Sequence, residues 1–187
     1  MRTALFLTAI GALFCRLVPH PPNAVPMGAL AIYAGACLPR RWAWLVPVAV
    51  MALSDFVIDS VLGRPLLDVT RWIIYGTIAA TTLIGPLAKR PKVGPWLLPA
   101  LSLSASVTFF ITTNFGAWLS LTFAYPKTLS GLLTAYAAGI PFFQNTVLAD
   151  LAGTAALFGL GSLLERAARH LTATRPEFVP VETNQVG

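Results

Sequence analysis

The chain has 187 residues, of which 56% are hydrophobic and only 11% are charged, and its formal net charge is +6. Soluble domains carry roughly 25% charged residues, so this composition excludes a globular protein with a water-facing surface. The basic residues lie in short loops between apolar runs, which indicates membrane topology and not a nucleic-acid partner.

Six apolar segments predict an all-α integral membrane protein with six transmembrane helices. Crossing a hydrocarbon core of about 30 Å takes about 20 apolar residues, so the chain has room for roughly six short-looped spans. Proline, glycine and charged residues separate the segments. We expect helices over Thr3–Val18, Met27–Leu38, Trp42–Leu62, Trp72–Leu87, Trp96–Leu119 and Ile140–Leu164.

Prolines refine this assignment. Pro47 predicts a kink in the third helix. The weakly apolar stretch Leu129–Ala138 is expected to form a half-helix in the membrane interface.

The first segment resembles a signal peptide, but no convincing cleavage site follows it, so we interpret it as a retained helix. Residues 1–164 then form a single transmembrane domain, and residues 165–187 form a polar cytoplasmic tail.

The distribution of lysine and arginine predicts the orientation. Cytoplasmic loops carry an excess of these residues, and tryptophans gather at the membrane surfaces. One side receives Arg2, Arg40, Arg41, Lys89, Arg90, Lys92, Arg166, Arg169 and Arg175, and the other receives Arg16, Arg64, Arg71 and Lys127. The tryptophans at 42, 44, 72, 96 and 118 all fall at predicted helix ends. Both termini are therefore expected in the cytoplasm.

Polar side chains concentrate in the outer halves of these helices and in the first outer loop. Polar groups inside a bilayer are costly, so they mark a packed interior or a ligand site. The inner half reads as almost purely apolar, which argues against a proton relay or channel. We therefore predict a cup that binds a solute from the periplasm. Its candidate residues are His20, Asn23, Asp55, Asp59, Tyr75, Asn114, Gln144 and Asn145, with Thr112, Thr113 and Asp150 nearby.

Structural roles are the alternative for the same residues. Asp55 could pair with Arg16 or Arg71 for packing alone. Three of the amides could be interhelical hydrogen-bond partners, namely Asn114, Gln144 and Asn145, and His20 could be a loop residue satisfied by backbone carbonyls. The protein would then be a non-transport structural or assembly protein of the membrane. The small residues Ala4, Thr8 and Ala12 repeat every fourth position, a pattern that permits contact with a partner protein or with the last helix.

Catalytic signatures are weak. The sequence contains no His-Glu-x-x-His, Gly-x-Ser-x-Gly or phosphate-binding loop motif. Asp55 and Asp59 lie on one helix face, whereas catalytic carboxylate dyads use opposing elements. Cys15 and Cys37 lie inside apolar segments without metal-binding spacing. We predict a protein that is not an enzyme and has no intrinsic cofactor.

Several long strings resemble a family of small bacterial inner-membrane proteins, over Arg16 to about Leu160. They are Arg16–Asn23, Pro26–Ala31, Pro47 with Leu53–Asp55, Thr113–Trp118 and Ala138–Thr146. This family is similar to the substrate-binding S-components of energy-coupling-factor vitamin transporters, and most closely to their BtuM-type solitary cobalamin transporter branch. The resemblance implies a six-helix S-component-like bundle with a periplasm-facing pocket.

The resemblance also implies a solute and a partner. The solute would be a vitamin-sized molecule, with a corrinoid (cobalamin) as the first candidate and a different vitamin, delivered with a separate energising membrane module, as the alternative. Ala4, Thr8 and Ala12 would face that module. The branch uses a cysteine as axial cobalt ligand, but Gly63–Arg71 and the start of the fourth helix contain none. His20 is the candidate cobalt ligand instead, since imidazole binds such metals well, and Cys15 is the next.

Overall fold

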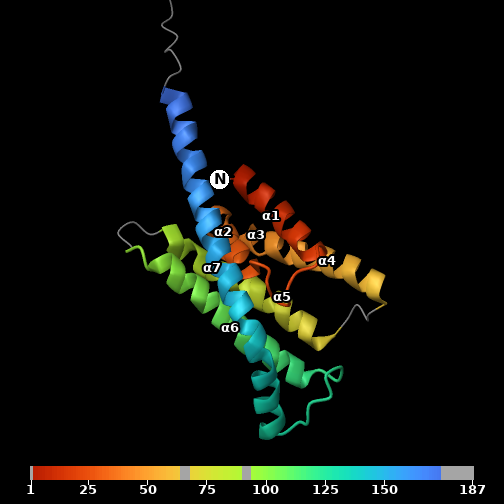
Figure 1. Cartoon of the computed structure of the whole chain (residues 1–187). Helices are drawn as coiled ribbons and strands as arrows, with labels where there is room; N and C mark the ends of the chain where they lie inside the picture. Colours follow the sequence, from red (N-terminus) through yellow and green to blue (C-terminus); the bar gives the residue numbers. More distant parts are fainter. Residues whose placement is uncertain (1, 64–67, 90–93, 174–187) are drawn as a thin grey trace, which may run out of the picture.

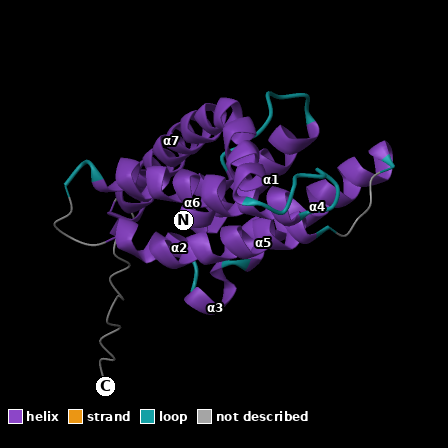
Figure 2. Cartoon of the chain, turned by 90° about the horizontal axis from the view of Figure 1, so that it is seen from below, coloured by secondary structure: helices purple, strands orange, loops and turns teal. Residues whose placement is uncertain are grey.

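The computed structural model describes residues 2–63, 68–89 and 94–173, and within these ranges it contains helices and no strand (Figure 2). The all-α prediction is confirmed. The elements are α1 (Arg2–Leu17), α2 (Met27–Cys37), α3 (Arg40–Ala43), α4 (Leu45–Leu62), α5 (Val69–Thr81), the 3₁₀ helix η1 (Thr82–Lys89), α6 (Leu97–Leu119) and α7 (Leu129–Ala173) (Figure 1).

Three helical stretches in the described residues are long and apolar enough to cross a membrane: Arg40–Leu62, Leu97–Leu119 and Leu129–Leu164. Their outward surfaces are apolar as well, since Phe56, Leu103 and Leu148 are all exposed. α2 is apolar but shorter. These features support the transmembrane character predicted from composition.

α2 is the centre of the bundle. Four consecutive residues, Ala29 to Ile32, are completely buried, because α1, α4, α5, η1, α6 and α7 all pack against this helix. A helix that is apolar on every side is expected to be enclosed. The apolar character of α2 on every side therefore agrees with its central position, where other helices enclose it.

Two glycines let α2 cross η1 backbone to backbone. A Cβ on Gly35 would overlap the carbonyl oxygen of Thr82, and a Cβ on Gly85 would overlap the carbonyl oxygen of Ile32. Any larger residue at either position would force the two elements apart. This contact fixes how the second and fourth predicted helices cross.

The structure refines one local prediction and corrects another. The third predicted helix is divided at Trp44 into α3 and α4, in the turn before Pro47, which has no N–H to donate to the carbonyl of Ala43. Pro47 lies in the first turn of α4, where its missing N–H is not needed by the helix. Leu129–Ala138 is not a separate half-helix: it is continuous with the last helix and forms the beginning of α7, which passes through Pro141. The C-terminal turns of α7 project beyond the other helices (Figure 1).

α6 and α7 pack antiparallel. The aromatic rings of Phe110 on α6 and Phe143 on α7 are in contact, with their centroids 4.9 Å apart. Nearer the end of α6, Tyr136 donates a hydrogen bond to the carbonyl of Ile111 at 3.0 Å. Toward the middle of the helices, Ser106 donates to Asp150 at 2.8 Å. These contacts define a register that determines which polar side chains of the two helices face each other.

Candidate functional site: a cavity at one end of the bundle

Three adjoining hollows open at one end of the bundle and share Asn23 and Phe109 as lining residues; together we call them the shared cavity. The first hollow, about 180 Å³, lies between the loop after α1, α4, α6 and α7. The second, about 240 Å³, lies between α5, α6 and α7. The third is about 720 Å³ and is bounded by α4, α5 and the chain after α6. Solute sites typically measure about 300–1,000 Å³.

The loop between α1 and α2 forms one wall of the shared cavity. Asn23 has a positive φ of 61°, a backbone conformation that asparagine tolerates better than most residues. The Asn145 amide of α7 donates to the carbonyl of Pro22 at 3.0 Å, which ties the loop to the last helix. The three prolines at 19, 21 and 22 further limit its backbone freedom. The wall is therefore held by local stiffness and by one long-range hydrogen bond.

A network of charges holds α1, α4 and α5 together beside the largest hollow. Arg16 pairs with Asp55, and Arg71 pairs with Asp59 and lies 3.9 Å from Asp55. Tyr75 donates a hydrogen bond to Asp55 at 2.9 Å. Two positive and two negative side chains balance each other, which offsets the cost of removing them from water. Asp55 therefore forms the ion pairs that the packing alternative described, and it also lines the cavity.

The eight predicted site residues divide into three groups. His20, Asn23, Asp55 and Asn114 line the shared cavity. Asp59, Tyr75 and Asn145 are outside its lining but hold lining residues or the loop in place. Gln144 is exposed on α7 and is not part of the lining.

Asn114 is positioned by its own helix and by a glycine opposite. Its side-chain amide donates to the carbonyl of Phe110 at 2.8 Å, which leaves the amide oxygen available for other partners. A Cβ on Gly139 of α7 would overlap this side chain. The absence of a side chain at position 139 therefore makes the space that Asn114 occupies at the second hollow.

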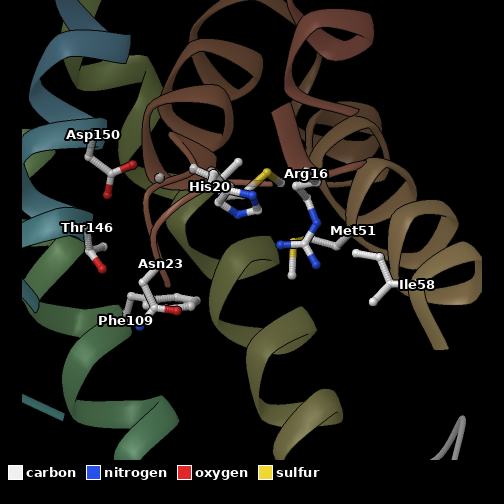
Figure 3. A pocket seen from close by; sticks show the side chains of 11 residues that line it. Arg16, His20, Asn23, Met51, Ile58, Phe109, Thr146 and Asp150 are labelled. Atoms are coloured by element: carbon white, nitrogen blue, oxygen red, sulfur yellow. The ribbon is translucent and has the colours of Figure 1, made fainter. Parts of the chain in front are cut away.

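Asp150 and Thr146 form the α7 side of the first hollow (Figure 3). Neither is among the eight predicted site residues: Asp150 was expected only near the cup, and Thr146 was missed. In this view they lie on one side and Arg16 and Met51 on the other, with His20 between them. Asp150 is only 1% exposed, and its carboxylate accepts hydrogen bonds from Ser106 at 2.8 Å and from the backbone N–H of Ala29 at 3.1 Å. The four-residue spacing of Thr146 and Asp150 places both on one helix face, a signal that the sequence contained.

The segment after α6 covers the cavity from another side. Phe123 lines the second and third hollows, and Ser120 donates to the carboxylate of Asp68 at 3.0 Å. Burial raises the pKa of Asp68, but hydrogen bonds from neighbouring hydroxyl and backbone N–H groups outweigh it, so its pKa lies below the ordinary value. Asp68 therefore remains ionised at neutral pH and holds this segment against the start of α5.

His20 is the residue that the sequence suggested as a candidate metal ligand. Its Nδ1 lies 2.8 Å from the carbonyl oxygen of Val18, and since a carbonyl only accepts, Nδ1 carries the proton. Nε2 of the neutral ring then keeps a lone pair. Among the described residues, no group of three or more His, Cys, Asp or Glu side chains is placed to hold a metal ion. Cys15 is exposed on α1 and does not line the cavity.

Of the small residues on α1, Ala12 is 5% exposed and packs in the core of the bundle. The side chains of Ala4 and Thr8 lie outside the described residues.

Comparison with known proteins gives one assignment. No curated protein and no solved structure matches the chain. A family model described as "Family of unknown function (DUF6580)" matches residues 1–174, which is most of the chain and includes every residue of the shared cavity. The chain belongs to this family.

Proposed function

We propose that the chain is a solute-binding uptake protein of the bacterial inner membrane, with six membrane crossings and both termini in the cytoplasm. The observation that supports this best is the shared cavity at one end of the bundle. That end carries Arg16, Arg71 and Lys127, the side with fewer basic residues. By the charge rule this end faces the periplasm.

The lining suits a vitamin-sized molecule. Binding sites for such solutes are mostly apolar and carry a few polar groups that fix orientation. Here Phe109, Ile74 and Phe123 supply apolar surface, while Asn23 and Asn114 supply amide groups. The largest hollow, about 720 Å³, is in the range of sites that bind such solutes.

A corrinoid is the first candidate solute, because His20 fits an axial cobalt ligand. The hydrogen bond from Nδ1 to a backbone carbonyl sets the ring tautomer and leaves Nε2 as the donor atom. Metal-binding histidines are commonly held in this way. Another vitamin, delivered with a separate energising module, is the second candidate: Phe6, Ile10 and Phe14 form an exposed apolar face of α1 that suits either a partner helix or lipid.

The test begins with the purified protein and its bound solute. After expression in a corrinoid-producing bacterium, the protein is denatured, and released small molecules are identified by mass spectrometry and visible absorption. A stoichiometric vitamin-sized compound supports the proposal, and corrinoid absorbance identifies the first candidate.

Uptake is then measured in a strain that depends on the identified compound. Exchange of the cavity residue Asn114 for Leu should abolish growth at low concentration of that compound, whereas Gln144→Leu, outside the cavity, should not. A purified protein that contains no small molecule, together with normal growth of a strain lacking the protein, would contradict the proposal and favour a structural role.

A further inference from the structure

A column of buried polar side chains runs between α6 and α7, away from the shared cavity. Thr146, Asp150 and Thr154 follow each other at four-residue intervals on α7, and Ser106 and Ser102 do so on α6. All five are at most 5% exposed. In the predicted topology Ser102 and Thr154 fall in the inner half, so the interface between α6 and α7 is more polar there than the sequence prediction described.

Asp150 is the charged member of the column. Its described protein partners are the hydroxyl of Ser106 and the backbone N–H groups of Ala29 and Gly28, and no basic side chain in the described part of the chain forms an ion pair with it. An ionisable group inside a membrane is costly unless it is compensated, and it marks ion or substrate pathways. A carboxylate also has more acceptor positions than these three donors occupy.

Helix capping explains part of this arrangement. The N-terminus of α2 has no side-chain cap of its own, and the carboxylate of Asp150 accepts from its first turn instead. Gly28 permits this approach, since a Cβ there would lie 2.5–2.9 Å from the carboxylate atoms. Capping accounts for the place of Asp150, but it does not account for the two hydroxyls that lie one turn further along the column.

Ser102 and Thr154 are that unexplained pair. Their side-chain oxygens are buried and have no hydrogen-bond partner within the described structure. From the antiparallel register that joins Ser106 to Asp150, we infer that Ser102, one turn earlier on α6, lies opposite Thr154, one turn later on α7. Buried hydroxyls are almost always satisfied, so an unsatisfied facing pair indicates an unseen partner between them.

We propose that a sodium ion binds between α6 and α7, held by the carboxylate of Asp150 and the hydroxyl oxygens of Ser102 and Thr154. Hard cations take oxygen ligands of these kinds. One carboxylate balances one positive charge, whereas a divalent ion would leave an uncompensated charge in a low-dielectric interior. The ion enters through the first hollow, whose lining includes Asp150 and Thr146. This site does not depend on which solute the shared cavity takes.

The test measures thermal unfolding of the full chain in detergent, in sodium chloride and in N-methyl-D-glucamine chloride of equal ionic strength. Saturating sodium should raise Tm by roughly 5 °C, because it binds only the folded protein. Asp150→Asn should abolish the rise. Since that change also alters the cap of α2, two further variants are needed that leave the cap intact.

Ser102→Ala and Thr154→Val remove hydroxyls that have no protein partner within the described structure, so neither should lower Tm in sodium-free buffer. Each should raise the sodium concentration for half-maximal stabilisation about tenfold, the loss expected for one good oxygen ligand. The matched controls are Ser104→Ala and Thr134→Val, whose exposed hydroxyls bond to their own helices; they should keep the wild-type response.

Two results would overturn the proposal. The first is an equal Tm in both salts for the wild type. The second is a stabilisation that follows pH but not sodium, which would make Asp150 a proton-binding group.

Discussion

Asn145 of α7 donates a side-chain hydrogen bond to the backbone carbonyl of Pro22 at 3.0 Å, across 123 positions of sequence. This contact joins the last long helix to the loop that forms one wall of the shared cavity. Asn114, another of the amides chosen from the sequence, lines the second hollow. The two amides therefore have different roles, one in positioning the loop and one in lining the site.

The different roles predict different phenotypes. Asn114→Leu should weaken solute binding at least tenfold and leave Tm within about 2 °C, because within the described residues its amide bonds to its own helix, at the carbonyl of Phe110. Asn145→Leu should lower both affinity and Tm, because it releases the loop. Binding by isothermal titration and melting by fluorescence check both. Gln144→Leu is the control, and normal binding in both variants would show that these amides serve packing only.

A pair of glycine substitutions tests the crossing of α2 and η1. Gly35→Ala should destabilise the protein by more than about 2 kcal/mol, since the added Cβ would overlap the Thr82 carbonyl. Gly76→Ala is the matched control: a Cβ at this position would meet no atom within 4 Å, so this helix substitution should be neutral or stabilising by up to about 1 kcal/mol. Equal melting temperatures for the two variants would contradict the close crossing.

The contribution of the charge network to the free energy of unfolding should also be measurable. Asp59 is 4% exposed and pairs with Arg71, so Asp59→Asn leaves a partly buried positive charge without its main partner. We expect a loss on the order of 2 kcal/mol, less than for a fully buried pair because Asp55 is still near. The double variant Asp59→Asn, Arg71→Met should lose less than the sum of the single variants. Additive losses in this double-mutant cycle would show that the pair is not coupled.

Helix positions are predictable from the sequence because apolar length and proline punctuation determine them. The second helix is expected to end at Leu38 and ends at Cys37, and the third and fifth end at Leu62 and Leu119 as expected. Breaks inside helices are not predictable in the same way. Pro47 coincides with a break one turn earlier, at Trp44, whereas Pro141 leaves α7 continuous, since tertiary packing decides whether a helix bends or ends at a proline.

The site is predictable as a region but not as a set of contacts. The predicted topology brings certain helix ends together at one membrane face, and four residues chosen on that basis line the shared cavity: His20, Asn23, Asp55 and Asn114. The register between α6 and α7 does not follow from the sequence. Without this register, the contact between Ser106 and Asp150 cannot be predicted. A serine within an apolar run does not by itself indicate a site residue.

Membrane orientation gives a further prediction. A reporter fused after Glu165 should be active as a cytoplasmic marker, and one inserted at Gly63 should be periplasmic, because most basic residues lie on the side of the termini. Gly63 suits insertion, since it ends α4 in a left-handed conformation at an exposed turn. A cytoplasmic signal at Gly63 would place the shared cavity on the cytoplasmic side and exclude uptake from the periplasm.

The last prediction concerns His20 and the identity of the solute. The imidazole stands in the first hollow, on a loop stiffened by prolines, with Nδ1 held by the carbonyl of Val18. If the solute is a corrinoid, coordination by Nε2 should shift its visible spectrum on binding, and His20→Ala should abolish the shift and weaken binding at least tenfold. Tm of the solute-free protein should hardly change, because His20 is exposed and its one hydrogen bond in the described part of the chain is local, to the carbonyl of Val18. Cys15→Ala is the control, since Cys15 is exposed and outside the cavity lining. A spectrum that responds to Cys15→Ala and not to His20→Ala would assign the metal bond to the thiol and move the site to the outer end of α1.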